Sequence, residues 1–436
     1  MTVADPAETQ RRRLQSRQRL LGIFGGSVGN LIEYYDWYAY ASFSLYFAHA
    51  FFPAGDQTAQ LLSTAAVFAV GFLMRPVGGW LMGSYADRHG RKSGLSLSVA
   101  LMCLGSLIIA LTPGYATIGV AAPVILVLAR LLQGLSLGGE YGTSATYLSE
   151  MATAGRRGFY SSFLYVTLVM GQLAALGVLL ILQRTLDDAA LHAWGWRIPF
   201  AFGAALAVVA MFLRRGLVES RTFVDSAKER AARPSALAEL AKHPREVLTV
   251  VGLTAGGTVA FYTYTTYLQK YLVNSAGFDK PRATLISALS LFGFMLMQPV
   301  VGRLSDSIGR RPILIAFGVL GSLGTVPLML AIGRSQSVVE ATLWALLALG
   351  MVSGYTSINA VVKAELFPVQ VRALGVALPY ALTVSVFGGS AEYLALWFKS
   401  RGHEAWFFWY VATMIGISLV VYVRMPDTRR TSRIEE

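Results

Sequence analysis

Two short polar turns of this chain share one pattern: Gly83-Ser-Tyr-Ala-Asp87-Arg88-His89-Gly90-Arg91-Lys92 and Gly302-Arg-Leu-Ser-Asp306-Ser-Ile-Gly309-Arg310-Arg311. Both read GxxxDxxGR followed by a second cation, and they lie 219 residues apart in a chain of 436. A second pair repeats at nearly the same distance, because Glu150 precedes Arg157 by seven residues just as Glu365 precedes Arg372. Two motifs repeated at half the chain length indicate two halves with a common ancestor.

The composition of the chain indicates a protein made for lipid. Hydrophobic residues make up 55% of the sequence and charged residues 14%, whereas a soluble domain carries about a quarter charged residues. A membrane-spanning helix needs about 20 mostly apolar residues. On that criterion we predict twelve spans, at 20–48, 61–86, 93–112, 121–148, 158–182, 196–214, 247–273, 284–302, 312–332, 338–362, 373–398 and 405–424.

These spans predict an all-α integral membrane protein in which twelve transmembrane helices form two pseudo-symmetric six-helix bundles. The predicted bundles are 20–214 and 247–424, joined by a polar linker at 215–246 and flanked by tails at 1–19 and 425–436. Parallel repeats of this kind are a transporter architecture, in which the substrate site lies between the halves near the bilayer midplane.

The distribution of basic residues predicts the orientation of the chain. Of the 37 Lys and Arg residues, 27 fall on the side of the N-terminus and 6 on the other side. Because cytoplasmic loops are enriched in Lys and Arg, both termini are predicted to be cytoplasmic, in the cell inner membrane. The net charge of +13 is then a topology signal and an attraction to anionic lipids, and it does not indicate nucleic-acid binding.

Several chemical classes find no support in the sequence. The one cysteine, Cys103, lies in an apolar run, and no Cys/His cluster suggests a metal site. The five His residues are scattered, and no Walker, GxSxG or HExxH motif occurs. We therefore expect neither an enzyme nor an ATPase, and no cofactor.

The residue types of the repeated turn suggest what each of them does. Glycine permits close helix contact and a sharp turn. An aspartate at a helix end can accept hydrogen bonds from the terminus of a neighbouring helix, and the Arg/Lys cluster holds the cytoplasmic face. Such a turn would latch one conformation and release in another, or it would only set topology. The predicted gating residues are Gly83, Asp87, Arg91, Asp306 and Arg310.

Four ionisable residues lie where a charge is costly. Glu33 and Asp36 share a face of the first span, Arg75 lies in the second and Arg130 in the fourth. A charge at the bilayer centre costs at least about 2.5–3.5 kcal/mol, so these are functional candidates. Their depths would allow the four to meet, either as a proton-coupling and anion-binding network or as a static network that fixes packing. The repeat aligns Arg75 with Gln298, so the cationic group belongs to the N-terminal half alone.

Two further charges lie toward the outer side of the second half. Lys270 is near the outer end of the seventh span, and Glu392 is at similar depth in the eleventh. We predict an ion pair between them in the empty protein, with Lys270 binding the second carboxylate of a dicarboxylic acid when substrate arrives; the alternative is that Lys270 snorkels to the headgroups. Tyr264, Tyr267 and Tyr271, at helical spacing, predict a hydroxyl-bearing wall or an interfacial aromatic belt.

The motifs resemble those of a known family. The turn after the second span and Arg130-Leu-Leu-Gln133-Gly134 resemble the major facilitator superfamily. Other stretches are similar to its metabolite:proton symporter family: Gly29-Asn30-Leu-Ile-Glu33-Tyr34-Tyr35-Asp36, Arg75-Pro76-Val-Gly78-Gly79, Gly138-Gly139-Glu140-Tyr141-Gly142 and Trp194-Gly-Trp196-Arg197-Ile-Pro199-Phe. The resemblance covers essentially the whole chain. Phe261 to Leu272 and Gly388 to Tyr393 are similar to carriers of α-ketoglutarate within that family.

The resemblance implies a secondary active transporter that carries a small organic anion inward with protons by alternating access. A dicarboxylate, α-ketoglutarate, is the expected substrate, and citrate, tartrate, shikimate or a zwitterionic osmolyte are the alternatives. The expected substrate-binding residues are Arg75, Lys270, Tyr34, Tyr267 and Arg197, the last being otherwise an interfacial anchor. The expected proton-coupling residues are Glu33, Asp36, Arg130 and Glu140. The expected partners besides substrate and protons are membrane lipids, and the expected working unit is a monomer.

Overall fold

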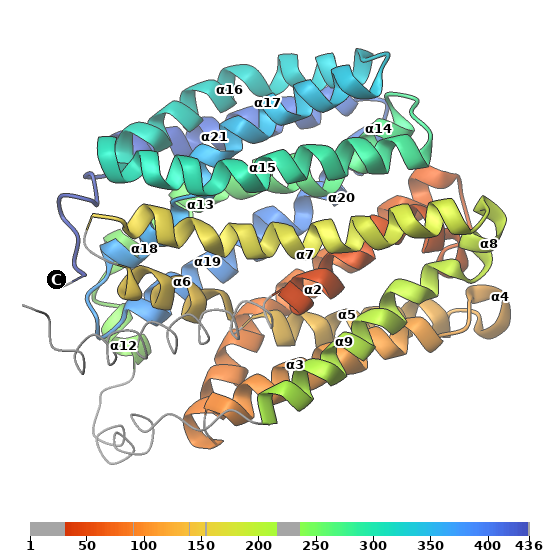
Figure 1. Cartoon of the computed structure of the whole chain (residues 1–436), viewed down its shortest axis with the longest axis horizontal. Helices are drawn as coiled ribbons and strands as arrows, with labels where there is room; N and C mark the ends of the chain where they lie inside the picture. The colour runs from red at the N-terminus through yellow and green to blue at the C-terminus, as the bar shows by residue number, and fades with distance from the viewer. Residues whose placement is uncertain (1–30, 90, 139, 153–154, 216–235, 435–436) are drawn as a thin grey trace, which may run out of the picture.

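A computed structural model describes residues 31–89, 91–138, 140–152, 155–215 and 236–434 of the chain. All regular structure in these described ranges is helical. The long helices run roughly along one common direction, which is horizontal in Figure 1. Among the described residues, eight helical stretches are long and apolar enough to cross a membrane.

The N-terminal half contributes the first group of elements. Residues 31–51 are helical, and they are followed by α2 (Gln57–His89), α3 (Arg91–Leu111), α4 (Tyr115–Ile118), α5 (Ala121–Leu137), α6 (Glu140–Met151), α7 (Arg157–Thr185), α8 (Asp188–Ala193), the 3₁₀ turn η1 (Gly195–Arg197) and α9 (Ile198–Arg215).

The C-terminal half contributes the second group. Its elements are α12 (Ala236–Leu240), α13 (Pro244–Tyr262), η2 (Thr263–Tyr267), α14 (Leu268–Asn274), α15 (Lys280–Ile308), α16 (Arg310–Arg334), α17 (Val338–Thr356), α18 (Asn359–Leu366), α19 (Arg372–Thr383), η3 (Val384–Gly388), α20 (Gly389–Ser400) and α21 (Glu404–Arg424).

The two ends of the molecule differ in what they carry. We call the end that holds the second polar motif and the C-terminal tail the motif face; it lies on the left of Figure 1, with α6, α12 and α18. The opposite face carries α4, α8 and α14. The motif is more helical than predicted, because α15 continues to Ile308 instead of ending at residue 302. Only Gly309, with φ 103°, makes the turn, in a region that favours glycine.

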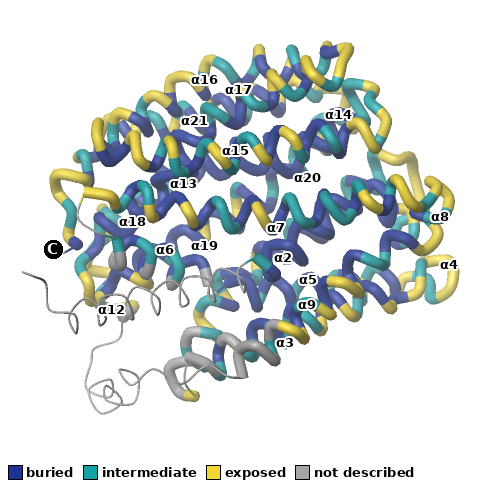
Figure 2. The backbone as a smooth tube through the Cα atoms, in the orientation of Figure 1, coloured by how far each residue is buried: buried dark blue, intermediate teal, exposed yellow. Residues whose placement is uncertain are grey.

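Burial separates an apolar outer surface from a polar interior. The large exposed side chains on the flanks are mostly apolar, as at Leu111, Leu323 and Val339, and Figure 2 shows exposed positions alternating along the outer helices. The interior holds charged side chains with almost no exposed surface, among them Arg130 and Lys270. An apolar exterior around a buried polar seam suits a protein whose outer solvent is lipid.

Glycines set the close approach of α2 and α5. A Cβ at Gly134 would collide with the backbone oxygen of Gly71, and a Cβ at Gly138 would collide with that of Arg75. Gly78 is equally close to the backbone of Leu135. Small residues four apart allow helix backbones to pack closely in membranes. The two glycine-containing motifs therefore fix the helix that carries Arg75 against the helix that carries Arg130.

Two π-helical segments lie where the halves meet. In η2, the Thr265 carbonyl accepts a hydrogen bond from Gln172 Nε2 of α7 at 2.7 Å. In η3, Ser385 Oγ donates to the Phe72 carbonyl of α2 at 2.6 Å. A π segment leaves the regular helical hydrogen-bond ladder, and such segments are frequent at functional sites. Both segments of the C-terminal half thus offer polar groups to the N-terminal half.

Candidate functional site

Two arginines converge on one tryptophan in the N-terminal half. The guanidinium carbon of Arg75 lies 4.3 Å from the ring centroid of Trp37, and that of Arg130 lies 4.1 Å from it. Arg75 also lies over the ring of Phe72, at 4.1 Å. Arg130 donates to Gln133 Oε1 at 2.6 Å. Both guanidinium groups keep a buried Nε and Nη2 without a hydrogen-bond partner, so they remain available to an anion.

The two acids of the first helix point elsewhere. Glu33 Oε1 accepts a hydrogen bond from Ser98 of α3 at 3.1 Å. Asp36 is fully buried, neither of its carboxylate oxygens has a hydrogen-bond partner, and a side chain at Gly203 of α9 would collide with Oδ1. Among the described residues, no ion pair joins either acid to Arg75 or Arg130. The expected network is therefore not one of direct ion pairs: the cations lie on aromatic rings, and Arg130 acts on Asp36 only at longer range, through its charge.

The two outer charges of the C-terminal half are in contact. Lys270 Nζ lies 3.1 Å from Glu392 Oε1, and both side chains are buried. Lys270 also donates to the Ala41 carbonyl of the N-terminal half at 2.7 Å. Since Lys270 follows η2 and Glu392 follows η3, each π segment positions one member of the pair. The side chain is buried between the two halves and does not extend to the surface of the protein, which contradicts the snorkelling alternative.

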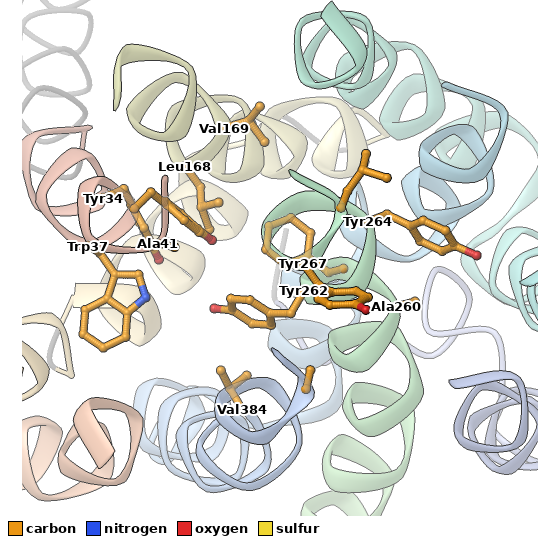
Figure 3. Close-up of a cluster of buried hydrophobic side chains, with 14 of the residues drawn as sticks. Tyr34, Trp37, Ala41, Leu168, Val169, Ala260, Tyr262, Tyr264, Tyr267 and Val384 are labelled. Carbon is orange, nitrogen blue, oxygen red and sulfur yellow. The ribbon is translucent and has the colours of Figure 1, made fainter. Parts of the chain in front are cut away.

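The predicted tyrosine wall is not continuous. Tyr267 donates its hydroxyl to Glu404 at 2.7 Å, on the opposite face, and Tyr271 donates to the Met329 carbonyl at 2.8 Å. Tyr264 extends away from Tyr34 and Trp37 (Figure 3). The π segment changes the helical phase within this run, and the three rings therefore diverge. Tyr267 has no place at the central arginines, which corrects its expected substrate contact.

Other tyrosines do reach the centre. Tyr34 packs beside Tyr38 with ring centroids 6.2 Å apart. Tyr262 of α13 contacts Phe72 edge-on at 5.2 Å, and Figure 3 shows it on the side of Tyr34 and Trp37. The substrate contact expected of Tyr34 stays a prediction, and Tyr262 is the residue of the aromatic run that lies on the side of Trp37.

Arg197 belongs to a structural contact. Its Nη1 donates to the carbonyl oxygens of Ala110 at 3.0 Å and Thr112 at 2.7 Å, at the end of α3. Its guanidinium lies 4.1 Å from the ring of Trp196. A cation favourably caps the C-terminal carbonyls of a helix. Arg197 is therefore an anchor of α3 rather than part of the central cluster, and its expected substrate contact is corrected.

On the motif face, Asp306 joins the two halves. Its carboxylate accepts hydrogen bonds from the backbone N–H groups of Gly158 at 2.8 Å and Phe159 at 2.9 Å, at the start of α7. Arg310 lies 2.8 Å from Asp306 and 3.3 Å from Glu365. We call Asp306, Arg310, Glu365 and the start of α7 the latch. The contact is the one that the chemistry of the motif predicts, while its gating role stays a prediction.

The first copy of the motif and Glu140 lie in helices of the N-terminal half. Gly83 and Asp87 fall in α2, Arg91 in α3 and Glu140 in α6. Their side-chain surroundings lie outside the described residues. Their expected gating and coupling roles therefore remain predictions.

The C-terminal tail adds a contact that the sequence did not predict. Residues 425–434 run along the motif face, where Thr428 donates to Glu365 at 2.6 Å. Arg157, from the N-terminal half, donates to the Ile434 carbonyl at 3.3 Å. The tail thus touches both halves beside the latch. Some of these contacts are made to backbone carbonyls. Because every residue has a backbone carbonyl, no sequence pattern predicts such contacts.

One buried lysine was also missed. Lys363 was assigned to a loop because the predicted span ended at residue 362, but α18 continues past it and the side chain is fully buried. Its Nζ donates to Asn359 Oδ1 at 2.8 Å and to the Tyr141 hydroxyl at 3.3 Å. It lies 3.9 Å from the ring centroid of Tyr380. An Asn and a Lys one helical turn apart, after a long apolar run, were the available signal.

The charged clusters follow one another along the helix axes. Lys270 and Glu392 lie toward the opposite face, and Arg75 and Arg130 lie in the middle. Lys363 comes next, and the latch lies at the motif face. Arg75 is 14 residues from the end of α2 at His89, about 21 Å along the axis, whereas Lys363 is only three residues from the end of α18, about 5 Å. The arrangement offers successive polar stations between the two halves.

Known proteins are similar to this chain in sequence and in fold. A family model described as Major Facilitator Superfamily matches residues 26–362 and, in a second match, residues 271–436. The chain is 54% identical over 428 residues to the alpha-ketoglutarate permease of Escherichia coli (strain K12), and the match covers 98% of each chain. It is 38% identical over 380 residues to the citrate-proton symporter of Salmonella typhi, covering 84% of this chain and 86% of that protein.

A solved structure has the same arrangement of helices. The xylose transporter XylE from E. coli, in a partially occluded inward open conformation, superposes with a TM-score of 0.71. The alignment covers 93% of this chain and 97% of the other, at 19% sequence identity. This likeness concerns the fold.

Proposed function

This chain belongs to the Major Facilitator Superfamily, and on that premise we propose that it is a proton-coupled symporter that carries a dicarboxylate, α-ketoglutarate, into the cell. Membership confirms the predicted twelve-helix membrane fold and makes the chain a transporter rather than an enzyme. The observation that carries the proposed substrate class is the pair of buried guanidinium groups, Arg75 and Arg130, which keep N–H groups without a hydrogen-bond partner and form no ion pair among the described residues.

Arg75 is the proposed carboxylate ligand. Its planar fork presents two N–H groups that match the two oxygens of a carboxylate. In the structure the guanidinium lies against the rings of both Trp37 and Phe72, and such rings stabilise a cation without neutralising it. Arg130 is already committed in part to Gln133. It would supply the surrounding positive potential, with Tyr34 and Tyr262 bounding the site.

Asp36 is the proposed carrier of the coupling proton, with Glu33 as the second candidate. A buried carboxylate without hydrogen-bond donors is costly in its charged form. The positive field of Arg130 favours that charged form, and an anion that binds the arginines weakens this support. Binding of the acid and of the proton are then linked, because each increases the affinity for the other.

Alternating access is the proposed cycle. The latch closes the motif face, since Asp306 of one half caps α7 of the other. Toward the opposite face, Lys270 pairs with Glu392 of its own half and donates across the halves to the Ala41 carbonyl. Each contact breaks when the halves separate at its own end. We further propose that Lys270 exchanges Glu392 for the second substrate carboxylate, so that its charge stays paired throughout.

The proposed location is the cell inner membrane, with both termini cytoplasmic and the motif face inside. The support is the excess of Lys and Arg on that side. We propose a monomer surrounded by lipid as the working unit, because the polar contacts described above close within one chain and the flanks are apolar. The proposed domain division follows the two halves, joined by a linker between α9 and α13.

Uptake into proteoliposomes tests the proposal. Purified protein should accumulate labelled α-ketoglutarate under an inwardly directed proton gradient, and unlabelled α-ketoglutarate should inhibit this uptake more strongly than citrate, tartrate, shikimate or betaine. Arg75→Lys should raise the half-saturating concentration about tenfold, because a point charge replaces a bidentate fork. The exposed Arg245 provides the matched control, Arg245→Lys, with wild-type uptake.

Proton coupling is tested separately. Asp36→Asn should retain exchange of labelled for unlabelled substrate but lose accumulation driven by the gradient. If Asp36→Asn and Glu33→Gln both accumulate substrate as the wild type does, neither acid carries the proton. Stronger inhibition by citrate than by any dicarboxylate would instead assign the protein to citrate.

A further inference from the structure

A buried lysine near the motif face, Lys363, has no anionic partner among the described residues. Lys363 Nζ has two oxygen acceptors, from Asn359 and Tyr141, and both are neutral. The nearby acid of α18, Glu365, is already paired with Arg310 and bonded by Thr428. Among the described residues no carboxylate lies within ion-pair distance of Lys363. Burial without a counter-ion disfavours the charged form of a lysine, so a lysine at this position points to an anion that reaches it when the motif face opens.

The surroundings of Lys363 come from both halves. Tyr141 belongs to α6 of the N-terminal half, and it donates its hydroxyl to Asn359 of α18 at 2.7 Å. Its ring stacks on Tyr380 of α19, with centroids 3.6 Å apart and planes 10° apart. The Lys363 Nζ lies over the ring of Tyr380, which belongs to the same half as Lys363. Any separation of α6 from α18 and α19 therefore unstacks the rings and uncovers Nζ.

The same separation opens the latch. Glu365 follows Lys363 by two residues in the same helix, and through Arg310 it holds Asp306 at the start of α7. Opening the motif face thus exposes a cation that the closed state covers with two rings and two neutral oxygens. Because Lys363 lies much nearer the motif face than Arg75 does, a small acid would meet the two cations in succession.

We propose that Lys363, together with Asn359 and Tyr141, forms a second anion site that takes a carboxylate of the transported acid on the motif side. This proposal rests on the proposed function, since it requires the solute to be an organic anion. In the closed state, Asn359 and Tyr141 hold the ammonium by dipoles alone. In the open state, the carboxylate replaces them as the stronger partner of a charged donor. The site would bind the acid on its way between Arg75 and the water at that face.

The test is an exchange assay from each face of the membrane. Right-side-out and everted vesicles carry the protein, and protease access to a C-terminal tag identifies which vesicles present the motif face outward. Lys363→Met should raise the half-saturating α-ketoglutarate concentration about tenfold or more when the acid is offered to the motif face. From the opposite face, the change should stay within about threefold, and Lys363→Arg should stay within about threefold from both faces.

A second variant works without removing the lysine. Asn359→Asp places a permanent carboxylate where the amide oxygen now accepts from Nζ at 2.8 Å. It should mimic Lys363→Met by occupying the ammonium, raising the motif-face constant about tenfold while leaving the fold intact. Lys242→Met, at an exposed lysine beside α12 that pairs with Glu239, is the matched control and should behave as the wild type.

The outcomes separate the two proposals. Wild-type vesicles that exchange no organic anion would overturn the proposed function and the anion site with it. Wild-type exchange with unchanged motif-face constants in both Lys363→Met and Asn359→Asp would overturn the anion site alone. An equal rise from both faces in both variants would also overturn it, because a purely structural role has no preferred side.

Discussion

Lys270 and Lys363 are both fully buried lysines of the C-terminal half, yet they are satisfied in different ways. Lys270 contacts the carboxylate of Glu392 at 3.1 Å and a backbone carbonyl of the other half. Lys363 contacts an amide oxygen, a phenol oxygen and an aromatic ring. The first has an internal counter-ion, and the second has none in the part of the chain that the structure describes.

The difference assigns different tasks to the two side chains. Removing one member of a buried ion pair leaves the other charge uncompensated, so a paired lysine is tied to the integrity of the fold. Removing a lysine that has only neutral partners leaves no such charge behind. Loss of Lys270 should therefore reduce stability in addition to removing its proposed substrate contact, whereas loss of Lys363 should affect only the affinity for an external anion.

The largest expected effect is that of Lys270→Met. This change leaves Glu392 buried and unpaired, and such a loss costs about 3–5 kcal/mol of the free energy of unfolding. We expect a large fall in the thermal unfolding temperature in detergent, measured by tryptophan fluorescence, and loss of transport. The double variant Lys270→Met/Glu392→Gln should recover most of the lost stability, because it removes both charges together.

The matched control for this prediction is Lys363→Met. It removes a buried lysine of the same half without stranding an acid, so its unfolding temperature should equal or exceed that of the wild type. Equal destabilisation by the two single variants would contradict the distinction between a paired and an unpaired lysine.

A smaller effect is expected at the latch. Asp306→Asn keeps the shape of the side chain but removes the charge that bonds the N–H groups of Gly158 and Phe159 and the guanidinium of Arg310. Hydrogen bonds to charged groups contribute about 1.5–3 kcal/mol, and the loss falls only on the state with a closed motif face. Exchange rates should therefore change several-fold while substrate binding at equilibrium, measured by calorimetry, changes little.

The control for the latch is an aspartate that joins nothing across the halves. Asp279 caps α15 through the Arg282 backbone N–H, and Asp279→Asn keeps a capping side chain. Wild-type exchange in Asp279→Asn together with altered exchange in Asp306→Asn would place the effect at the junction of the halves. Abolished binding in Asp306→Asn would show instead that Asp306 supports the substrate site.

The sequence predicted the outline of the molecule because lipid imposes strong rules on it. Apolar runs of spanning length, a repeated motif and an asymmetric distribution of basic residues each have one physical reading. The contact between Lys270 and Glu392 was also predictable, because an unpaired charge inside a membrane is costly and two opposite charges at the same depth can pair. The Asp306 contact followed from the affinity of a carboxylate for a helix N-terminus.

The missed details depend on tertiary packing. The sequence gives no signal for the π segments η2 and η3. The predicted alignment of Tyr264, Tyr267 and Tyr271 assumed regular helical spacing and was therefore wrong. Arg75 and Arg130 were expected to meet acids directly, but their closest contacts are aromatic rings. Lys363 was not predicted to be a buried residue. A hydropathy criterion ends a membrane span at a charged residue, even where that residue is buried against the other half.

The smallest effect is expected at a third lysine, which is paired but not buried. Lys280 contacts Asp188 at 3.2 Å on the opposite face, and the Asp188 side chain is 67% exposed. Exposed ion pairs contribute about 0–1 kcal/mol because water and salt screen them. Asp188→Asn should therefore leave the unfolding temperature and the transport rate near the wild-type values, and raising the salt concentration should remove any residual difference. A destabilisation as large as that of Lys270→Met would mean that pairing alone, without burial, determines the importance of a lysine in this protein, and the contrast between Lys270 and Lys363 would then need another cause.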